Sequence, residues 1–89
     1  MSAGDTDAAI ASLEAQLKRN PGQAALLINL GSAYARAGRN DEARQAYRAA
    51  ISARERVQLE LADGSWEDSR DAARIALSGL EQRTAFAVK

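Results

Sequence analysis

The fold is decided by residues 27–50, which read LINLGSAYARAGRNDEARQAYRAA. On both sides of Gly38, apolar residues recur every three or four positions, which is the spacing of one face of an α-helix. We expect Gly38 to end the first helix, because glycine readily adopts the left-handed backbone that follows a helix. Asn40 or Asp41 is expected to cap the second helix. Since the loop between them is short, the two helices are predicted to pack antiparallel as a helical hairpin.

A narrower apolar stripe before the hairpin predicts another helix, over residues 7–19. Its members lie at helical spacing and are Ala9, Ile10, Leu13 and Leu17. The residues able to cap its start by accepting backbone N–H groups are Asp5, Thr6 and Asp7. The helix is expected to end at Asn20-Pro21, since the residue before a proline disfavours helical backbone.

Small and aromatic residues are spaced along the hairpin as they are in a known repeat. The pattern is Leu27-x-x-Leu30-Gly31-x-x-Tyr34, followed by Ala43-x-x-x-Tyr47-x-x-Ala50. This spacing resembles the tetratricopeptide repeat. A small residue such as Gly31 lets two helix backbones approach closely, while an aromatic residue such as Tyr47 fills the wider space between helices.

The period of this family supports the resemblance on the N-terminal side. One repeat length of about 34 residues before Ala43 and Tyr47 stand Ala9 and Leu13. Pro21 falls where the pattern places the proline that closes a repeat. The resemblance therefore extends to the helix that precedes the hairpin.

The resemblance implies one full repeat, at about 24–57, preceded by a half repeat at 7–21. Leu30 and Tyr34 have no counterparts one repeat length further on, and Glu55 stands where the full repeat's own proline is expected. The expected organisation is one domain, 1–89, with repeat-like helices at 7–54 and a divergent C-terminal cap at 55–89.

The C-terminal cap leaves two interpretations open at residues 57–61. In one, the helix of the hairpin continues to Ala62, since no proline stops it. In the other, the alternation of apolar and polar residues in VQLEL indicates a β-strand that ends before the Asp63-Gly64 turn. The strand is the favoured interpretation, and a second short strand is predicted at 85–88.

Between these strands we expect a helix from about Trp66 to Arg83, with Trp66 in the core. Ser65 followed three residues later by Asp68 resembles the capping box that opens a helix. The expected packing face consists of Ala73, Ile75, Ala76, Leu77 and Leu80. The predicted fold class is thus mainly α, with tetratricopeptide-like hairpins, a C-terminal helix and one or two short strands at 57–61 and 85–88.

The resemblance implies a non-catalytic protein–protein interaction module. Such repeats stack into a superhelix whose concave face, lined by the first helix of each pair, binds peptide segments. On this sequence the partner-binding residues of that face would be Ile28, Asn29, Ser32 and Arg36. Because repeats bury their faces against neighbours and this chain holds only one and a half, we expect a protein or peptide partner, or a second copy of the chain, to cover the open faces.

Two alternative functions are weighed against this one. The first is an assembly subunit that uses the repeat only to form a homodimer. The second, less favoured, is a regulator that binds nucleic acid or an acidic ligand through the arginines between 36 and 56. The chain carries 12 basic and 12 acidic residues, so it lacks the positive charge typical of a nucleic-acid binder, and we predict no nucleic-acid partner.

Catalysis is not predicted. The chain contains no His and no Cys, so a His-based triad, a thiol nucleophile and the common zinc sites are excluded. One concentration of carboxylates consists of Asp63, Glu67, Asp68 and Asp71. A turn residue and negative charge at a helix N-terminus explain it without a metal. We predict no catalytic, cofactor-binding or metal-binding residue.

No targeting or membrane-spanning segment is recognised. Residues 1–7 hold neither the basic nor the apolar part of a secretory signal peptide, and no stretch approaches about 18 apolar residues. We expect a soluble protein with no membrane partner, cytoplasmic as the sequence stands, or periplasmic if an export signal has been removed. The abundance of Arg and Ala resembles that of short bacterial repeat proteins.

Overall fold

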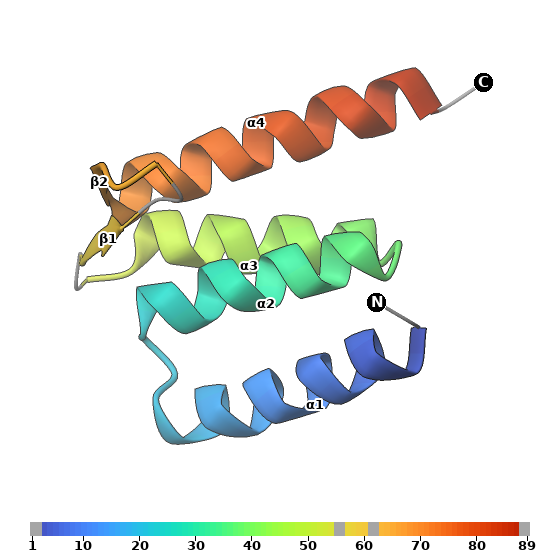
Figure 1. Cartoon of the computed structure of the whole chain (residues 1–89), viewed down its shortest axis with the longest axis horizontal. Coiled ribbons are helices and arrows are strands. Elements are labelled where there is room, and N and C mark those ends of the chain that lie inside the picture. Colours follow the sequence, from blue (N-terminus) through green and yellow to red (C-terminus); the bar gives the residue numbers. More distant parts are fainter. Residues whose placement is uncertain (1–2, 55–56, 61–62, 88–89) are drawn as a thin grey trace.

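Four helices and a two-stranded ribbon make up the computed structural model, which describes residues 3–54, 57–60 and 63–87. In chain order they are α1 (Ala3–Arg19), α2 (Ala24–Arg36), α3 (Asn40–Ser52), β1 (Gln58–Glu60), β2 (Trp66–Asp68) and α4 (Ser69–Ala87). α2 and α3 form the predicted hairpin, with α1 against α2 on one side and α4 against α3 and α2 on the other (Figure 1). The mainly α fold is confirmed.

The turn between α2 and α3 shows why Gly38 ends the first helix. Gly38 has a φ of 78°. Its N–H donates to the Ala35 carbonyl at 3.1 Å, and the N–H of Arg39 donates to the Tyr34 carbonyl at 2.9 Å. These bonds satisfy carbonyls that the end of a helix leaves without partners. The predicted cap of α3 is wrong, because the turn leads directly into a helix that begins at Asn40 and follows Arg39 without a side-chain capping bond.

The core lies between α2 and α3 and at the contacts that these two helices make with α1 and α4. One cluster of buried residues holds all four helices together, and it consists of Ile10, Leu30, Ala33, Tyr34, Ala43, Ala46, Tyr47 and Leu80. Ala43 is fully buried, and a Cβ on Gly31 would come within 2.6 Å of the Tyr47 ring. Small residues therefore allow α2 and α3 to pack closely, as the spacing predicts.

α1 begins earlier than predicted. It starts at Ala3, so Asp5, Thr6 and Asp7 lie inside the helix instead of capping it. An acidic residue in the first turn interacts favourably with the helix dipole, so Asp5 does not stop the helix from extending toward the N-terminus. The C-terminal end is as predicted, because α1 stops at Arg19, directly before Asn20-Pro21.

The strand interpretation of 57–61 is confirmed for residues 58–60, and position 61 lies outside the described residues. The long-helix alternative is wrong, since α3 ends at Ser52. β1 pairs antiparallel with β2, so that Gln58 lies opposite Asp68 and Glu60 opposite Trp66. β2 is a strand where the sequence predicts the first turn of a helix.

α4 begins at Ser69 instead of Trp66 because its cap differs from the predicted one. The Asp68 carboxylate accepts a hydrogen bond from the backbone N–H of Arg70 at 2.8 Å, as an N-cap does. Ser65, the predicted cap, donates its N–H and its hydroxyl to Asp63 instead. The turn residues therefore satisfy one another, and the helix starts after β2.

The strand predicted at 85–88 is wrong, because residues 85–87 belong to α4. Position 88 lies outside the described residues. The segment that follows Gly79 contains neither Gly nor Pro and includes Ala85 and Ala87, and alanine has the highest helix propensity. The helix therefore continues to its last described residue.

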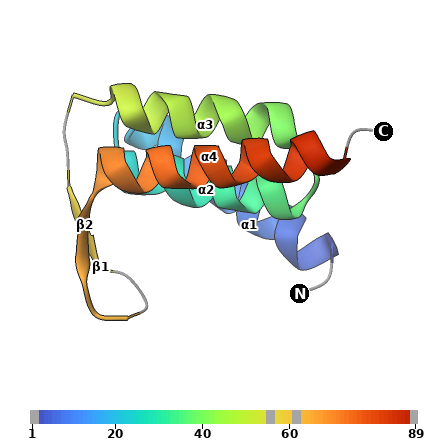
Figure 2. The same cartoon turned by 90° about the horizontal axis from the view of Figure 1, so that it is seen from above.

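Two hydrogen bonds join the ribbon to α4. The N–H of Ser69 donates to the Val57 carbonyl at 2.8 Å, and the N–H of Val57 donates to the Ser69 hydroxyl at 3.1 Å. The ribbon leaves one end of the helices and extends away from α3 (Figure 2). Trp66 is 62% exposed on this ribbon, so its predicted place in the core is wrong.

Candidate functional site

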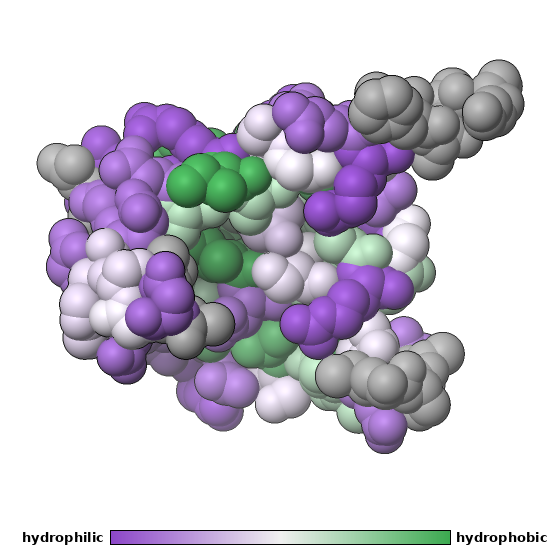
Figure 3. All heavy atoms as spheres, turned by 45° about the horizontal axis from the view of Figure 1, so that its top comes forward, coloured by the Kyte–Doolittle hydropathy of each residue, from purple (hydrophilic) through white to green (hydrophobic). Residues whose placement is uncertain are grey.

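A hollow lies beside α2 on the face turned away from α3. Hydrophobic residues gather in its middle and hydrophilic side chains surround it (Figure 3). Part of it is a cavity of about 670 Å³ between α2 and α4, with the Tyr47 side chain of α3 at its base. The residues that line this cavity are Ser32, Ala35, Arg36, Tyr47, Ile75, Ala76, Gly79 and Arg83.

A second cavity, of about 420 Å³, lies on the other side of α2, against α1. It is lined by Ala9, Ser12, Leu13, Gln16, Asn29, Ser32, Ala33 and Arg36. Ser32 and Arg36 line both cavities, so α2 forms the ridge between them. We call the two cavities together the α2 groove.

Three of the four residues predicted to bind a partner lie in the α2 groove. Asn29 and Arg36 are exposed and Ser32 is half-buried, and all three are on α2. Ile28 does not line the groove, because its half-buried side chain packs against the core clusters. The helical spacing of 29, 32 and 36 places these residues on one face, whereas Ile28 turns toward the interior.

The base of the groove is held by Tyr47. Its hydroxyl is 3.1 Å from the hydroxyl of Ser32, within hydrogen-bonding distance, and its ring packs against the backbone at Gly31. Tyr47 is only 4% exposed, so its ring has little freedom to move. Tyr47 of α3 therefore holds the Ser32 hydroxyl in position at the base of the groove.

α4 contributes groove residues that the sequence pattern does not mark as a site. Ile75, predicted to face the core, is 66% exposed and lines the cavity with Gly79 and Arg83. Ser69 and Ala73 are the residues that α4 buries completely at this end, at 0% exposure. A buried serine carries no hydrophobic signal, so the apolar pattern alone gives the wrong rotation for the first turns of α4.

Two arginines at the groove have no partner among the described residues. Arg36 and Arg83 line the α2–α4 cavity, and neither makes a hydrogen bond or ion pair within the described ranges. Arg39, Arg44 and Arg74 instead pair with Glu42, Asp41 and Asp71, respectively. The groove therefore offers positive charge that these carboxylates do not neutralise.

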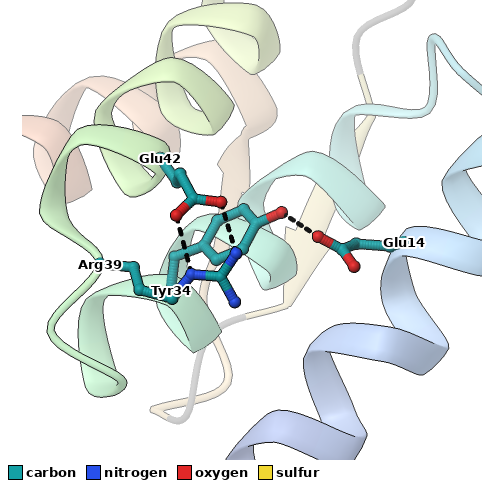
Figure 4. Close-up of polar contacts among 4 residues, drawn as sticks. All are labelled: Glu14, Tyr34, Arg39 and Glu42. Atoms are coloured by element: carbon teal, nitrogen blue, oxygen red, sulfur yellow. Dashed lines mark hydrogen bonds and ion pairs between the residues drawn. The ribbon is translucent and has the colours of Figure 1, made fainter.

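A separate polar cluster joins α1, α2 and α3 (Figure 4). The Tyr34 hydroxyl donates to Glu14 at 2.5 Å, and the Arg39 guanidinium lies 4.8 Å from the centre of the Tyr34 ring. Arg39 also donates two hydrogen bonds to Glu42, at 2.8 and 2.6 Å. The cluster links residues of three helices and the α2–α3 turn.

Burial and hydrogen bonding in this cluster shift two pKa values in opposite directions. Burial of the Tyr34 phenol, followed by its hydrogen bond to Glu14, raises the pKa of Tyr34 to about 12. The hydrogen bond from Arg39 lowers the pKa of Glu42. Both shifts favour the protonation states that hold the cluster together at neutral pH.

Three carboxylates near the start of α4 serve local structure. Asp63 bonds to Ser65, Asp68 caps α4 and Asp71 pairs with Arg74. Among the described residues, no group of three or more His, Cys, Asp or Glu is placed to hold a metal ion. In the same part of the chain, no helix is both long and apolar enough to span a membrane.

Comparison with known proteins identifies the family. The model of the tetratricopeptide repeat matches residues 1–56, which include α1, α2 and α3. Searches of curated proteins and of solved structures gave no match. The match covers more than half of the 89 residues, and the structure contains the antiparallel hairpin that the pattern implies. The chain belongs to the tetratricopeptide repeat family.

Proposed function

We propose that this protein is a non-catalytic interaction module that binds a segment of another protein in the α2 groove. The observation that carries the proposal is the position of Asn29, Ser32 and Arg36, which line two adjoining cavities along one helix. Tetratricopeptide repeats are typically protein–protein interaction modules, and this groove is a concave surface of the kind that holds a peptide.

The groove combines the two kinds of contact that peptide recognition needs. The exposed Asn29 amide can donate and accept hydrogen bonds, which suits the backbone of a bound peptide. Ile75 provides exposed apolar surface, and Arg36 and Arg83 provide charges that suit carboxylates. A segment with acidic and apolar residues therefore matches the groove better than a basic one.

The surroundings of Ser32 support a non-catalytic role for the groove. Ser32 is a hydroxyl-bearing residue shared by both cavities, and its hydrogen-bond partner is the Tyr47 hydroxyl. A serine nucleophile needs a neighbouring base to take its proton, and a phenol hydroxyl is a poor base. The pair fits a structural role at the base of the groove.

The test is selection of peptides against the purified chain. A library of random peptides displayed on phage would be selected on the immobilised protein, and an enriched peptide titrated by fluorescence anisotropy. We expect Asn29→Ala and Arg36→Glu to raise its dissociation constant, the charge reversal by about tenfold or more. Arg48→Glu is the matched control, because Arg48 is an exposed arginine on α3 that lines neither cavity.

Nuclear magnetic resonance spectra of the isotope-labelled protein show which residues contact the bound peptide. The proposal requires that the peptide shifts the amide signals of residues 29, 32 and 36 more than those of exposed α3 residues. Enriched peptides that bind Arg36→Glu as tightly as the wild type, or that shift only signals of α3, would show that the groove is not the binding surface.

A further inference from the structure

The ribbon of β1 and β2 is built to reach beyond its own helices. β2 ends at Asp68 and α4 begins at Ser69 with no linker between them, and Val57 is bonded to Ser69 twice. The ribbon is therefore attached directly to one end of α4 and extends away from α3 (Figure 2). The α2 groove opens in that direction as well, since α3 supplies its base through Tyr47.

The ribbon has several acidic side chains and one large aromatic side chain, that of Trp66. Residues 57–69 contain four acidic residues and no Lys or Arg. Asp63 and Asp68 are engaged in the turn and in the cap of α4, whereas Glu60 has no partner among the described residues. Glu60 lies directly opposite Trp66 in the antiparallel pair, so both side chains project from the same face of the ribbon.

The α2 groove has the complementary chemistry. Trp66 and Ile75 are the large hydrophobic residues that the described part of the chain leaves exposed, at 62% and 66%. Ile75 lines the α2 groove together with Arg36 and Arg83, which have no partner among the described residues. One surface thus presents an indole beside a carboxylate, and the other presents an aliphatic side chain beside two guanidinium groups.

We propose that the α2 groove of one copy of this chain holds the ribbon of a second copy. Trp66 of one copy packs on Ile75 and Gly79 of the other, and Glu60 pairs with Arg36 and Arg83. When two copies face each other groove to groove, each ribbon enters the opposite groove, so the contact is made twice about a two-fold axis. The inference rests on the proposed function of the groove and assigns it an occupant.

Size and charge favour this occupant. A cavity of about 670 Å³ lies in the range of sites that enclose a small molecule, so it has room for an indole ring. The net charge of the chain is zero, yet acidic groups concentrate on the ribbon and free arginines in the groove, so two copies attract each other in this orientation. In its own chain Trp66 is 62% exposed and does not line the cavity, which leaves the cavity open to a second copy.

Sedimentation equilibrium of the full chain over about a hundredfold range of concentration tests the proposal. We expect a monomer–dimer equilibrium that weakens as salt is raised, because exposed ion pairs are screened. Trp66→Ser and Ile75→Ser should each raise the dimer dissociation constant by about tenfold or more. Both positions are exposed, and circular dichroism checks that the helices remain. Arg48→Glu is the control that should leave the equilibrium unchanged.

Mixing the two variants separates a ribbon-in-groove contact from any other dimer. The Trp66→Ser chain keeps an intact groove and the Ile75→Ser chain keeps an intact ribbon, so a mixture regains one of the two contacts. We expect association in the mixture at concentrations where each variant alone is monomeric. Trp66 is the one tryptophan of the sequence, so its fluorescence in the mixture should shift to shorter wavelength as the indole is buried.

A wild-type chain that stays monomeric throughout, variants that dimerise as the wild type does, or a mixture that stays monomeric would each overturn the inference. The selected peptides keep this outcome separate from the proposed function. If the chain is monomeric and a peptide still binds at residues 29, 32 and 36, the groove is a binding surface for other proteins only. If no peptide binds there either, the proposed function fails as well.

Discussion

The ring of Tyr47 occupies the space that a side chain at position 31 would need. A Cβ on Gly31 would lie 2.6 Å from Cε1 and 2.7 Å from Cδ1 of Tyr47. Tyr47 is 4% exposed and its hydroxyl lies beside that of Ser32, so the ring cannot move aside without disturbing the core and the base of the groove. The glycine of the repeat pattern is therefore required by packing between α2 and α3.

Replacement of Gly31 by alanine should destabilise the protein in spite of the higher helix propensity of alanine. We expect a loss of about 1–3 kcal/mol in the free energy of unfolding, as is typical of overpacking in a core. Urea unfolding followed by circular dichroism measures it. Gly79→Ala is the matched control, because its Cβ would meet only Arg83 Nη1 at 3.6 Å and should stabilise α4 by up to about 1 kcal/mol. Equal stability of Gly31→Ala and wild type would contradict the close approach.

The α2–α3 hairpin could be predicted because its determinants are local. The pattern from Leu27 to Ala50 sets which residues face each other, and Gly38 supplies the left-handed turn that only glycine adopts without strain. Asn29, Ser32 and Arg36 share the groove for the same reason, since their spacing fixes their common face. These features depend on neighbours within one or two helical turns.

The C-terminal part could not be predicted in the same way. Trp66 and Asp68 fit the start of a helix as well as a strand, and only pairing with Gln58 and Glu60 decides the outcome. The rotation of α4 depends on the burial of Ser69, which contributes two bonds to Val57 but no hydrophobic signal. The groove residues of α4 follow from that rotation, so sequence periodicity alone does not reveal them.

Replacement of Gly38 by alanine should also destabilise the protein, through the backbone. Its φ of 78° lies in the left-handed region, where a Cβ clashes with the following carbonyl at a cost of about 1–2 kcal/mol. No atom lies within 4 Å of the added Cβ, so the effect is conformational and not due to packing. Gly22→Ala, which meets nothing within 4 Å and has no left-handed backbone, should change the free energy of unfolding by less than about 0.5 kcal/mol. Similar results for both variants would contradict this explanation.

The raised pKa of Tyr34 predicts a loss of stability in alkaline solution. The pKa of a tyrosine is 10.0 in the unfolded chain and about 12 for Tyr34 in the fold, because burial and the bond to Glu14 favour the neutral phenol. The resulting stabilisation is complete below pH 10 and is lost as the pH rises from 10 to 12. Chemical unfolding at a series of pH values, compared with Tyr34→Phe, measures it.

The Phe variant separates Tyr34 from other groups that titrate in alkali. It lacks the hydroxyl bond to Glu14, so we expect it to be less stable at neutral pH by about 1 kcal/mol. Between pH 10 and 12, its stability should fall less steeply than that of the wild type. Parallel curves for the two proteins in this interval would show that Tyr34 ionises equally in the folded and unfolded chains.

Replacement of Ser69 by alanine should loosen the ribbon. The variant removes the acceptor of the Val57 N–H, and the loss of a partner for a part-buried N–H costs about 1–3 kcal/mol. We expect the Val57 amide to exchange with solvent faster, as measured by hydrogen exchange, while the amides of α2 and α3 stay protected. Ser78→Ala is the control, because Ser78 is exposed on the same helix and its replacement should leave the exchange of the Val57 amide unchanged.

The Ser69→Ala variant should also weaken the self-association proposed above, because a loosened ribbon enters the groove of a second copy less readily. A Val57 amide that exchanges at the wild-type rate in Ser69→Ala would mean that strand pairing and the backbone bond from residue 69 to the Val57 carbonyl hold the ribbon without the hydroxyl.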